Sequence, residues 1–91
     1  MKIYAIEFKT SALKELQRLP KTAQIDILES MKLLAADPYS RLLPTRKMEG
    51  GGERDLYRLR VQEYRVVYEI MKDQVVIYIL RLGHRKDVYR V

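Results

Sequence analysis

The sequence contains no cysteine and only one histidine among its 91 residues. The absence of cysteine excludes disulfides, thiolate nucleophiles and cysteine-based zinc sites, and it is typical of proteins from a reducing compartment. A single histidine excludes a metal site built from several imidazoles. We therefore expect neither a metal ion nor another cofactor.

Long apolar runs are also absent. No segment approaches the roughly 20 apolar residues that a membrane-spanning helix needs, and the N-terminus lacks the pattern of a signal peptide. We predict a soluble, cytoplasmic protein that makes no membrane contact. A chain of 91 residues is long enough for one hydrophobic core, so we expect one domain over residues 1–91.

Positive charge is concentrated in the second half of the chain. The net charge is +6, of which residues 1–40 contribute +1 and residues 41–91 contribute +5. A basic surface attracts nucleic acid or an acidic protein segment. We therefore expect a negatively charged partner, either nucleic acid or an acidic protein segment, to bind the C-terminal half.

Residues 55–71 alternate between two kinds of side chain, which predicts a β-hairpin. Apolar and tyrosine side chains form one set: Tyr57, Leu59, Val61, Tyr64, Val66 and Tyr68. The other set consists of Arg58, Arg60, Arg65 and Val67. If Gln62 and Glu63 form a two-residue turn, two residues face each other across the hairpin when their numbers add up to 125, so Arg60 faces Arg65 and Arg58 faces Val67. One sheet face is then core, and the other carries three guanidinium groups.

Arginines that face each other across a hairpin repel, and such pairs cost roughly 0.2–1 kcal/mol each. The simplest explanation is a solvated outer face that happens to be basic. We favour a docking surface for a polyanion, because His84 and Arg85 follow at the end of the next strand.

The first 36 residues predict a strand and two helices. The strand is expected from Lys2 to Phe8, and Thr10 or Ser11 is expected to cap the first helix, which Pro20 ends. The second helix is expected from Lys21 or Thr22 to Ala36, before Asp37-Pro38. Its expected core stripe comprises Ala23, Ile27, Met31 and Leu34, widened by Ile25, Leu28, Leu33 and Ala35.

Residues 39–53 have no clear period and are expected to form a loop that Leu42, Leu43 and Met48 attach to the core. Lys72 and Asp73 mark a turn before a strand over Val75–Leu82, which is apolar on both faces and therefore expected inside the sheet, in a register that the pattern leaves open. Gly83 is expected to end it, with a tail or edge strand after it. Together these elements predict an α+β fold, in which the N-terminal strand and the helical hairpin pack on one face of a mainly antiparallel sheet.

The C-terminal residues could cleave RNA without a metal. His84 can exchange a proton near neutral pH, and Arg65 and Arg85 can bind phosphate oxygens in a two-pronged geometry. Tyr89 can hydrogen-bond a phosphate or stack on a base. Metal-free RNA cleavage needs a base for the 2′-hydroxyl, cations for the phosphorus oxygens and a donor for the leaving 5′-oxygen.

Three segments resemble the RelE/ParE superfamily of toxins from bacterial and archaeal toxin–antitoxin pairs. They read LYRLRV, EYRVVYEI and GHRKDVYR, and their spacing is similar to the RelE branch in particular. The resemblance implies a small RelE-like fold and a ribosome-dependent mRNA endonuclease that acts in the ribosomal A site and inhibits translation. It also implies a cognate antitoxin. Whether the toxin–antitoxin complex, and only the complex, also binds operator DNA is left open.

By the same resemblance, the basic positions of the family fall on Arg58, Arg60, Arg65 and Arg85, and the terminal tyrosine on Tyr89. The best-studied RelE type has lysines in place of Arg58, Arg60 and His84, so the identity of the base is open. We assign the base to His84 as a hypothesis. The catalytic set is then Arg65, His84, Arg85 and Tyr89, and Arg58, Arg60 and Lys86 bind RNA.

Two other functions stay open. A ParE-type toxin shares the fold and poisons DNA gyrase without enzymatic activity, although it has no need of His84. A basic DNA-binding or adaptor domain is the third hypothesis. It is weakened because the second helix carries only Lys21 and Lys32 as basic residues.

Overall fold

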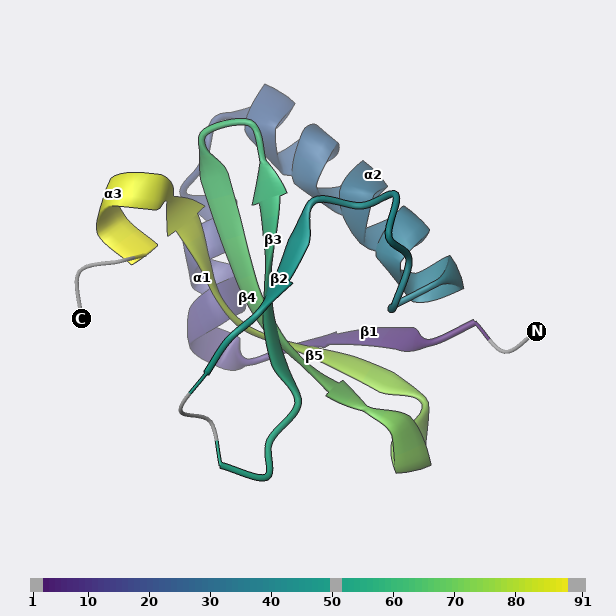
Figure 1. Cartoon of the computed structure of the whole chain (residues 1–91). Helices are drawn as coiled ribbons and strands as arrows, with labels where there is room; N and C mark the ends of the chain where they lie inside the picture. Colours follow the sequence, from purple (N-terminus) through teal and green to yellow (C-terminus); the bar gives the residue numbers. More distant parts are fainter. Residues whose placement is uncertain (1–2, 50–51, 89–91) are drawn as a thin grey trace.

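The computed structural model describes residues 3–49 and 52–88, and it has the α+β architecture that the sequence predicts. A mixed sheet contains the strands β1 (Ala5–Phe8), β5 (Val76–His84), β4 (Tyr64–Met71), β3 (Leu56–Val61) and β2 (Thr45–Lys47), in that spatial order (Figure 1). β1 runs parallel to β5, and every other neighbouring pair is antiparallel.

Two helices cover one face of the sheet (Figure 1). α1 (Thr10–Gln17) and α2 (Lys21–Ala36) form the expected helical hairpin with its break at Pro20. The predicted cap at Thr10 or Ser11 is wrong, because Lys9 occupies the cap position without a side-chain hydrogen bond. The Lys9 amide still donates to Ile79 of β5 at 2.9 Å, while its carbonyl accepts from Leu13. The strand therefore passes into the helix at Lys9.

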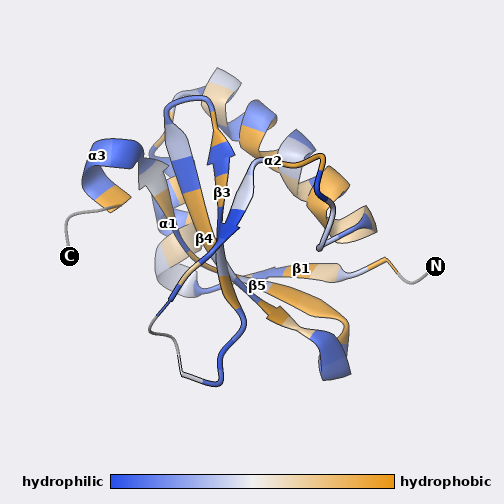
Figure 2. Cartoon of the chain, viewed as in Figure 1, coloured by the Kyte–Doolittle hydropathy of each residue, from blue (hydrophilic) through white to orange (hydrophobic). Residues whose placement is uncertain are grey.

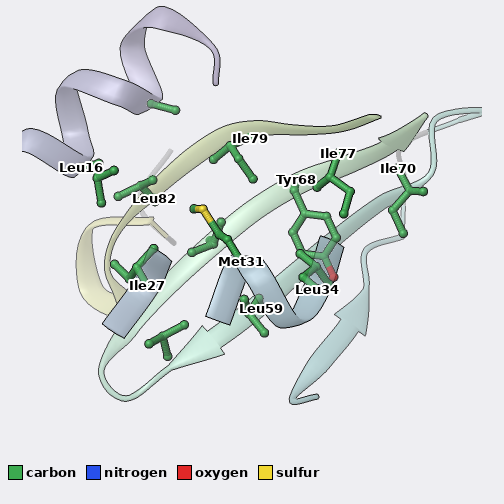
Figure 3. Packing of buried hydrophobic residues seen from close by; sticks show 13 residues of the cluster. Leu16, Ile27, Met31, Leu34, Leu59, Tyr68, Ile70, Ile77, Ile79 and Leu82 are labelled. Carbon is green, nitrogen blue, oxygen red and sulfur yellow. The ribbon is translucent and has the colours of Figure 1, made fainter. Parts of the chain in front are cut away.

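The core lies between α2 and the inner face of the sheet. Figure 3 shows Met31 and Leu34 of α2 beside Leu59, Tyr68 and Ile77 of the strands, all of which are buried. Burying one such side chain contributes about 1.5–3 kcal/mol relative to leaving it exposed. This packing fixes which face of the hairpin is left for the solvent.

The apolar stripe of α2 is narrower than predicted. Ala23, Ile27, Met31, Leu34 and Ala35 are buried as expected. By contrast, Ile25, Leu28 and Leu33 are exposed, Leu33 to 60%. A straight helix contacts a sheet along one stripe, so side chains on the flanks of that stripe stay in solvent.

The segment after α2 is more structured than predicted. The three residues of β2 pair with Tyr57–Leu59 of β3. A strand of three residues is too short to show an alternating pattern in the sequence. Leu43 packs against the core as expected, and Met48 is half-buried, but Leu42 is 95% exposed. The expected turn at Lys72 and Asp73 is a short 3₁₀ helix, η1 (Lys72–Gln74).

The C-terminal predictions need two corrections. β5 lies inside the sheet as expected, but it continues through Gly83 to His84. The chain then forms a helical turn, α3 (Arg85–Val88), instead of a tail or an edge strand. Buried Val88 packs beside Gly83 of the strand, at ordinary van der Waals distance from the position that a Cβ would take there.

Beyond the end of β1, α1 covers the edge of β5. The Leu82 amide donates to Oε1 of Glu15 at 3.1 Å, and Oε2 of Glu15 lies 3.7 Å from Nη2 of Arg81. A carboxylate on α1 thus satisfies a strand amide that has no β1 residue opposite it in the observed register.

Candidate nucleic-acid interface

The β3–β4 hairpin has the predicted register, and it separates the two sets of side chains. Arg60 pairs with Arg65 and Arg58 with Val67 on the outer face, whereas Leu59 pairs with Val66 on the inner face. Residues that pair directly point to the same side of a sheet. The predicted outer face with three arginines is therefore confirmed.

A fourth arginine joins this surface from β2. Arg46 pairs with Arg58 across the β2–β3 ladder. Together with Pro44 and Thr45, the four residues Arg46, Arg58, Arg60 and Arg65 line a hollow of about 420 Å³, and none of these described lining residues is acidic. We call this surface the arginine face. The sequence analysis missed Arg46 because β2 itself was missed.

Arg65 is held at the hairpin turn. Its Nη1 donates to the carbonyl oxygens of Gln62 at 3.1 Å and Tyr64 at 2.9 Å. The hairpin turn is itself attached to α2, because Nε2 of Gln62 donates to Oδ2 of Asp26 at 2.9 Å. The guanidinium of Arg65 is therefore positioned by backbone atoms of a turn that is connected to the helical layer.

His84 lies on the other side of the sheet from the arginine face. In the β4–β5 ladder His84 pairs with Tyr64 of the inner set, whereas Gly83 pairs with Arg65 of the outer set. The imidazole ring contacts the Tyr64 ring edge-on, with 6.0 Å between centroids. The sequence analysis expected His84 close to the arginines above one face, and the register corrects this: the two meet only through the hairpin turn.

The hairpin turn binds His84 and the start of α3. Nε2 of His84 lies 3.3 Å from Oε2 of Glu63, and Nδ1 accepts from the Lys86 amide at 3.2 Å. The Arg85 amide donates to the Glu63 carbonyl at 2.8 Å. The turn Gln62–Glu63 therefore has direct contacts to Arg65, His84 and Arg85.

α3 carries two of the predicted RNA-contacting cations. Arg85 and Lys86 are exposed, and Figure 2 shows most of α3 as hydrophilic. Val88 packs near Gly83, whose position pairs with Arg65 of the arginine face. Tyr89 lies outside the described residues.

A tyrosine cluster marks the opposite end of the hairpin. The Tyr57 and Tyr68 rings stack with centroids 5.8 Å apart, and the Tyr39 hydroxyl donates to Oδ2 of Asp55 at 2.7 Å. Burial and the hydrogen bond to Asp55 raise the pKa of Tyr39 and of Tyr57. These groups are protonated at neutral pH and belong to the scaffold.

Tyr68 is the buried member of this cluster. Burial raises the pKa of Tyr68, and the nearby Thr45 side chain offsets part of the rise. The Thr45 contact does not reach hydrogen-bonding geometry, so the buried Tyr68 hydroxyl has no partner among the described residues. The inner face therefore contains one unsatisfied polar atom.

Two features are absent from the described part of the chain. No three histidine, cysteine, aspartate or glutamate side chains there come close enough together to hold a metal ion. None of its helices has the length and apolar character to cross a membrane.

Comparisons with known proteins agree on one group of toxins. A family model described as the ParE toxin of the type II toxin–antitoxin system parDE matches residues 6–89. A RelE-like toxin protein of Escherichia coli is 30% identical over 90 residues, which cover 97% of this chain and 92% of the relative. The mRNA interferase toxin RelE of Escherichia coli K12 is 26% identical over 88 residues, with coverages of 94% and 90%.

The fold comparison points the same way. A chain in the crystal structure of the archaeal RelE–RelB complex from Pyrococcus horikoshii OT3 matches with a TM-score of 0.78 and 34% sequence identity. The match covers 98% of this chain and 99% of the archaeal one. The similarity therefore includes all the elements that form the arginine face and the hairpin turn.

Proposed function

This chain belongs to the RelE/ParE superfamily of toxins from type II toxin–antitoxin systems, and we propose that it is a ribosome-dependent mRNA endonuclease of the RelE branch. We also propose that residues 1–91 act as one domain, and that cleavage of mRNA in the ribosomal A site stops translation. A curated relative named mRNA interferase supports it.

The arginine face is the observation that carries this proposal. Four arginines around one hollow without an acidic lining residue suit a phosphate backbone. The Arg60–Arg65 pair costs the fold about 0.2–1 kcal/mol. A bound polyanion offsets this repulsion, which gives the pair a role that folding alone does not.

Each predicted residue takes a role in this proposal. Arg58, Arg60 and Lys86 bind the RNA, and Arg46 joins them because it lines the same hollow as Arg58 and Arg60. Arg65 and Arg85, which contact the same hairpin turn as His84, neutralise the charge that grows on the phosphorus oxygens at that end of the sheet. His84 exchanges the proton, Tyr89 positions the RNA, and the reaction uses no metal or other cofactor.

The proposed partners follow from the comparisons and the charge. The archaeal neighbour was crystallised as a RelE–RelB complex, so we propose a cognate antitoxin that inhibits this chain. With a net charge of +6, the chain favours an acidic antitoxin segment. Operator DNA is proposed as a partner of the toxin–antitoxin complex only.

Primer extension on mRNA bound to translating ribosomes tests the enzymatic proposal. We expect Arg65→Ala and Arg85→Ala each to lower the cleavage rate about 100-fold, because each removes a donor to the transition state. The matched control is Arg18→Ala, which removes an exposed arginine at the end of α1, on the helical layer. Cleavage by both variants at the parent rate contradicts the catalytic assignment.

A ParE-type gyrase inhibitor is the second candidate, because the matching family model is described as a ParE toxin. Such a binder needs no proton exchange, so His84→Ala would leave its toxicity unchanged. A gyrase supercoiling assay beside the primer-extension assay separates the two. Inhibited supercoiling without mRNA cleavage favours the ParE-type function.

A further inference from the structure

We propose that Glu63 is a positioning residue that fixes the protonation pattern and orientation of the His84 imidazole. The inference rests on the proposed function, and it concerns a residue to which the sequence analysis assigns a place in the turn but no role in the site. Glu63 is the second residue of the hairpin turn, and its carboxylate lies 3.3 Å from Nε2 of His84. Its side chain is largely exposed, so packing does not account for the contact.

Glu63 contacts the catalytic region in two ways. Its carboxylate faces the imidazole, and its carbonyl oxygen accepts the Arg85 amide at 2.8 Å. The same residue therefore orients His84 and fixes the point at which α3 leaves β5. Arg65 reaches the neighbouring carbonyl of Gln62, so one turn places all three groups.

The contacts determine which ring nitrogen carries the hydrogen in neutral His84. A backbone amide can only donate, so the Lys86 amide at 3.2 Å requires a lone pair on Nδ1. The hydrogen of the neutral ring is then on Nε2, from which it is donated to the Glu63 carboxylate. A carboxylate in this position holds the tautomer and the orientation of the ring.

This arrangement makes Nδ1 the atom that exchanges a proton with RNA. The ribose 2′-hydroxyl replaces the Lys86 amide at Nδ1 and transfers its proton there, while the 2′-oxygen bonds to phosphorus and the bond from phosphorus to the 5′-oxygen breaks. The leaving 5′-oxygen takes one proton from solvent, and the imidazolium returns one to solvent. Throughout the step the hydrogen on Nε2 stays there and remains hydrogen-bonded to the Glu63 carboxylate.

Nuclear magnetic resonance tests the orientation without any RNA. Because the chain has a single histidine, both ring ¹⁵N signals belong to His84, and only Nδ1 and Nε2 have to be told apart, by their couplings to the ring C–H protons. We expect a protonated Nε2 and an unprotonated Nδ1 in the neutral ring. Glu63→Leu should broaden the Nε2–H signal by exchange with water, whereas Glu63→Gln, whose amide oxygen still accepts, should keep it.

Kinetics on ribosomes tests the consequence for cleavage. We expect Glu63→Leu to lower kcat about tenfold, as loss of the orienting partner of a reactive imidazole does, and to leave KM unchanged. Glu63→Gln should restore most of the rate. Glu63→Leu in the His84→Ala background should cause no further loss, and Glu7→Leu, at an exposed carboxylate on β1, is the control.

Three results overturn the inference: a hydrogen on Nδ1 in the wild type, an Nε2–H signal that survives Glu63→Leu unchanged, or a full loss of rate from Glu63→Leu when His84 is already alanine. If the wild-type chain does not cleave mRNA, the proposed function fails. The Nε2–H signal then still shows whether Glu63 orients His84, so the two failures are distinguishable.

Discussion

The two faces of the β3–β4 hairpin are made by alternate residues of the same two strands, yet they have opposite effects on stability. On the inner face Leu59, Val66 and Tyr68 are at most 1% exposed and pack under α2. On the outer face Arg60 opposes Arg65 at a cost to the fold. Neighbouring residues of one strand therefore separate stability from function.

Truncating the inner face should have the largest effect. We expect Leu59→Ala to lower the free energy of unfolding by about 2–5 kcal/mol, because it removes buried methyl groups and leaves a cavity. Denaturant titration measures the change. Leu42→Ala is the matched control, since Leu42 is 95% exposed and its truncation should change stability by less than about 0.5 kcal/mol. Equal losses in both variants would contradict the inner-face assignment.

Tyr68 is the exception on the inner face, because its buried hydroxyl has no hydrogen-bond partner within residues 3–49 and 52–88. We expect Tyr68→Phe to raise the free energy of unfolding by about 1 kcal/mol, since it removes a desolvated polar atom. A loss of stability instead would show that the hydroxyl has a partner in solution, such as a water molecule.

The same substitution should change the alkaline limb of the stability curve. An unfolded tyrosine ionises near its ordinary pKa of 10.0, whereas burial raises the pKa of Tyr68 in the folded chain. Above pH 10 the unfolded state therefore releases a proton that the folded state keeps, so stability falls as the pH rises. Denaturant titrations across this range should show a shallower fall for Tyr68→Phe than for the wild type.

The smallest effect on stability is expected on the arginine face, and like that of Tyr68→Phe it is an increase. Arg60→Ala removes the repulsion with Arg65 and should raise stability by about 0.2–1 kcal/mol. It should also weaken binding of single-stranded RNA and reduce the slope of log K against log salt by about 0.7, the value for one lost phosphate contact. An unchanged slope would place Arg60 outside the RNA contact.

The hairpin was predictable from the sequence, whereas the position of His84 was not. Alternation over both strands and a two-residue turn determine the register of Arg58, Arg60 and Arg65. β5 is apolar on both faces, so its pattern does not choose between registers. A bulge at Leu80 sets the register of the second half of β5. Ile79 pairs with Tyr68 and Arg81 pairs with Val67, so the pairing shifts by one residue at Leu80.

That shift determines the face on which the imidazole lies. If the pairing of the first half of β5 continued without the bulge, Leu82 would oppose Arg65 on the outer face, and His84 would point to that side. With the bulge, Leu82 is buried and His84 shares the inner side with Tyr64. β2 and α3, of three and four residues, are too short for a periodic signal.

The parallel pairing of β1 with β5 joins the first strand of the chain to the last one. During synthesis β1 emerges first, whereas its neighbour β5 emerges only after β2, β3 and β4. A nascent chain that stops before Val76 therefore leaves Ile6 and Phe8 without their strand partners. The sheet that carries the arginines is therefore completed only after the segment Val76–His84 has been synthesised, so a chain cut short before β5 lacks the strand that joins β1 to the arginine-bearing hairpin.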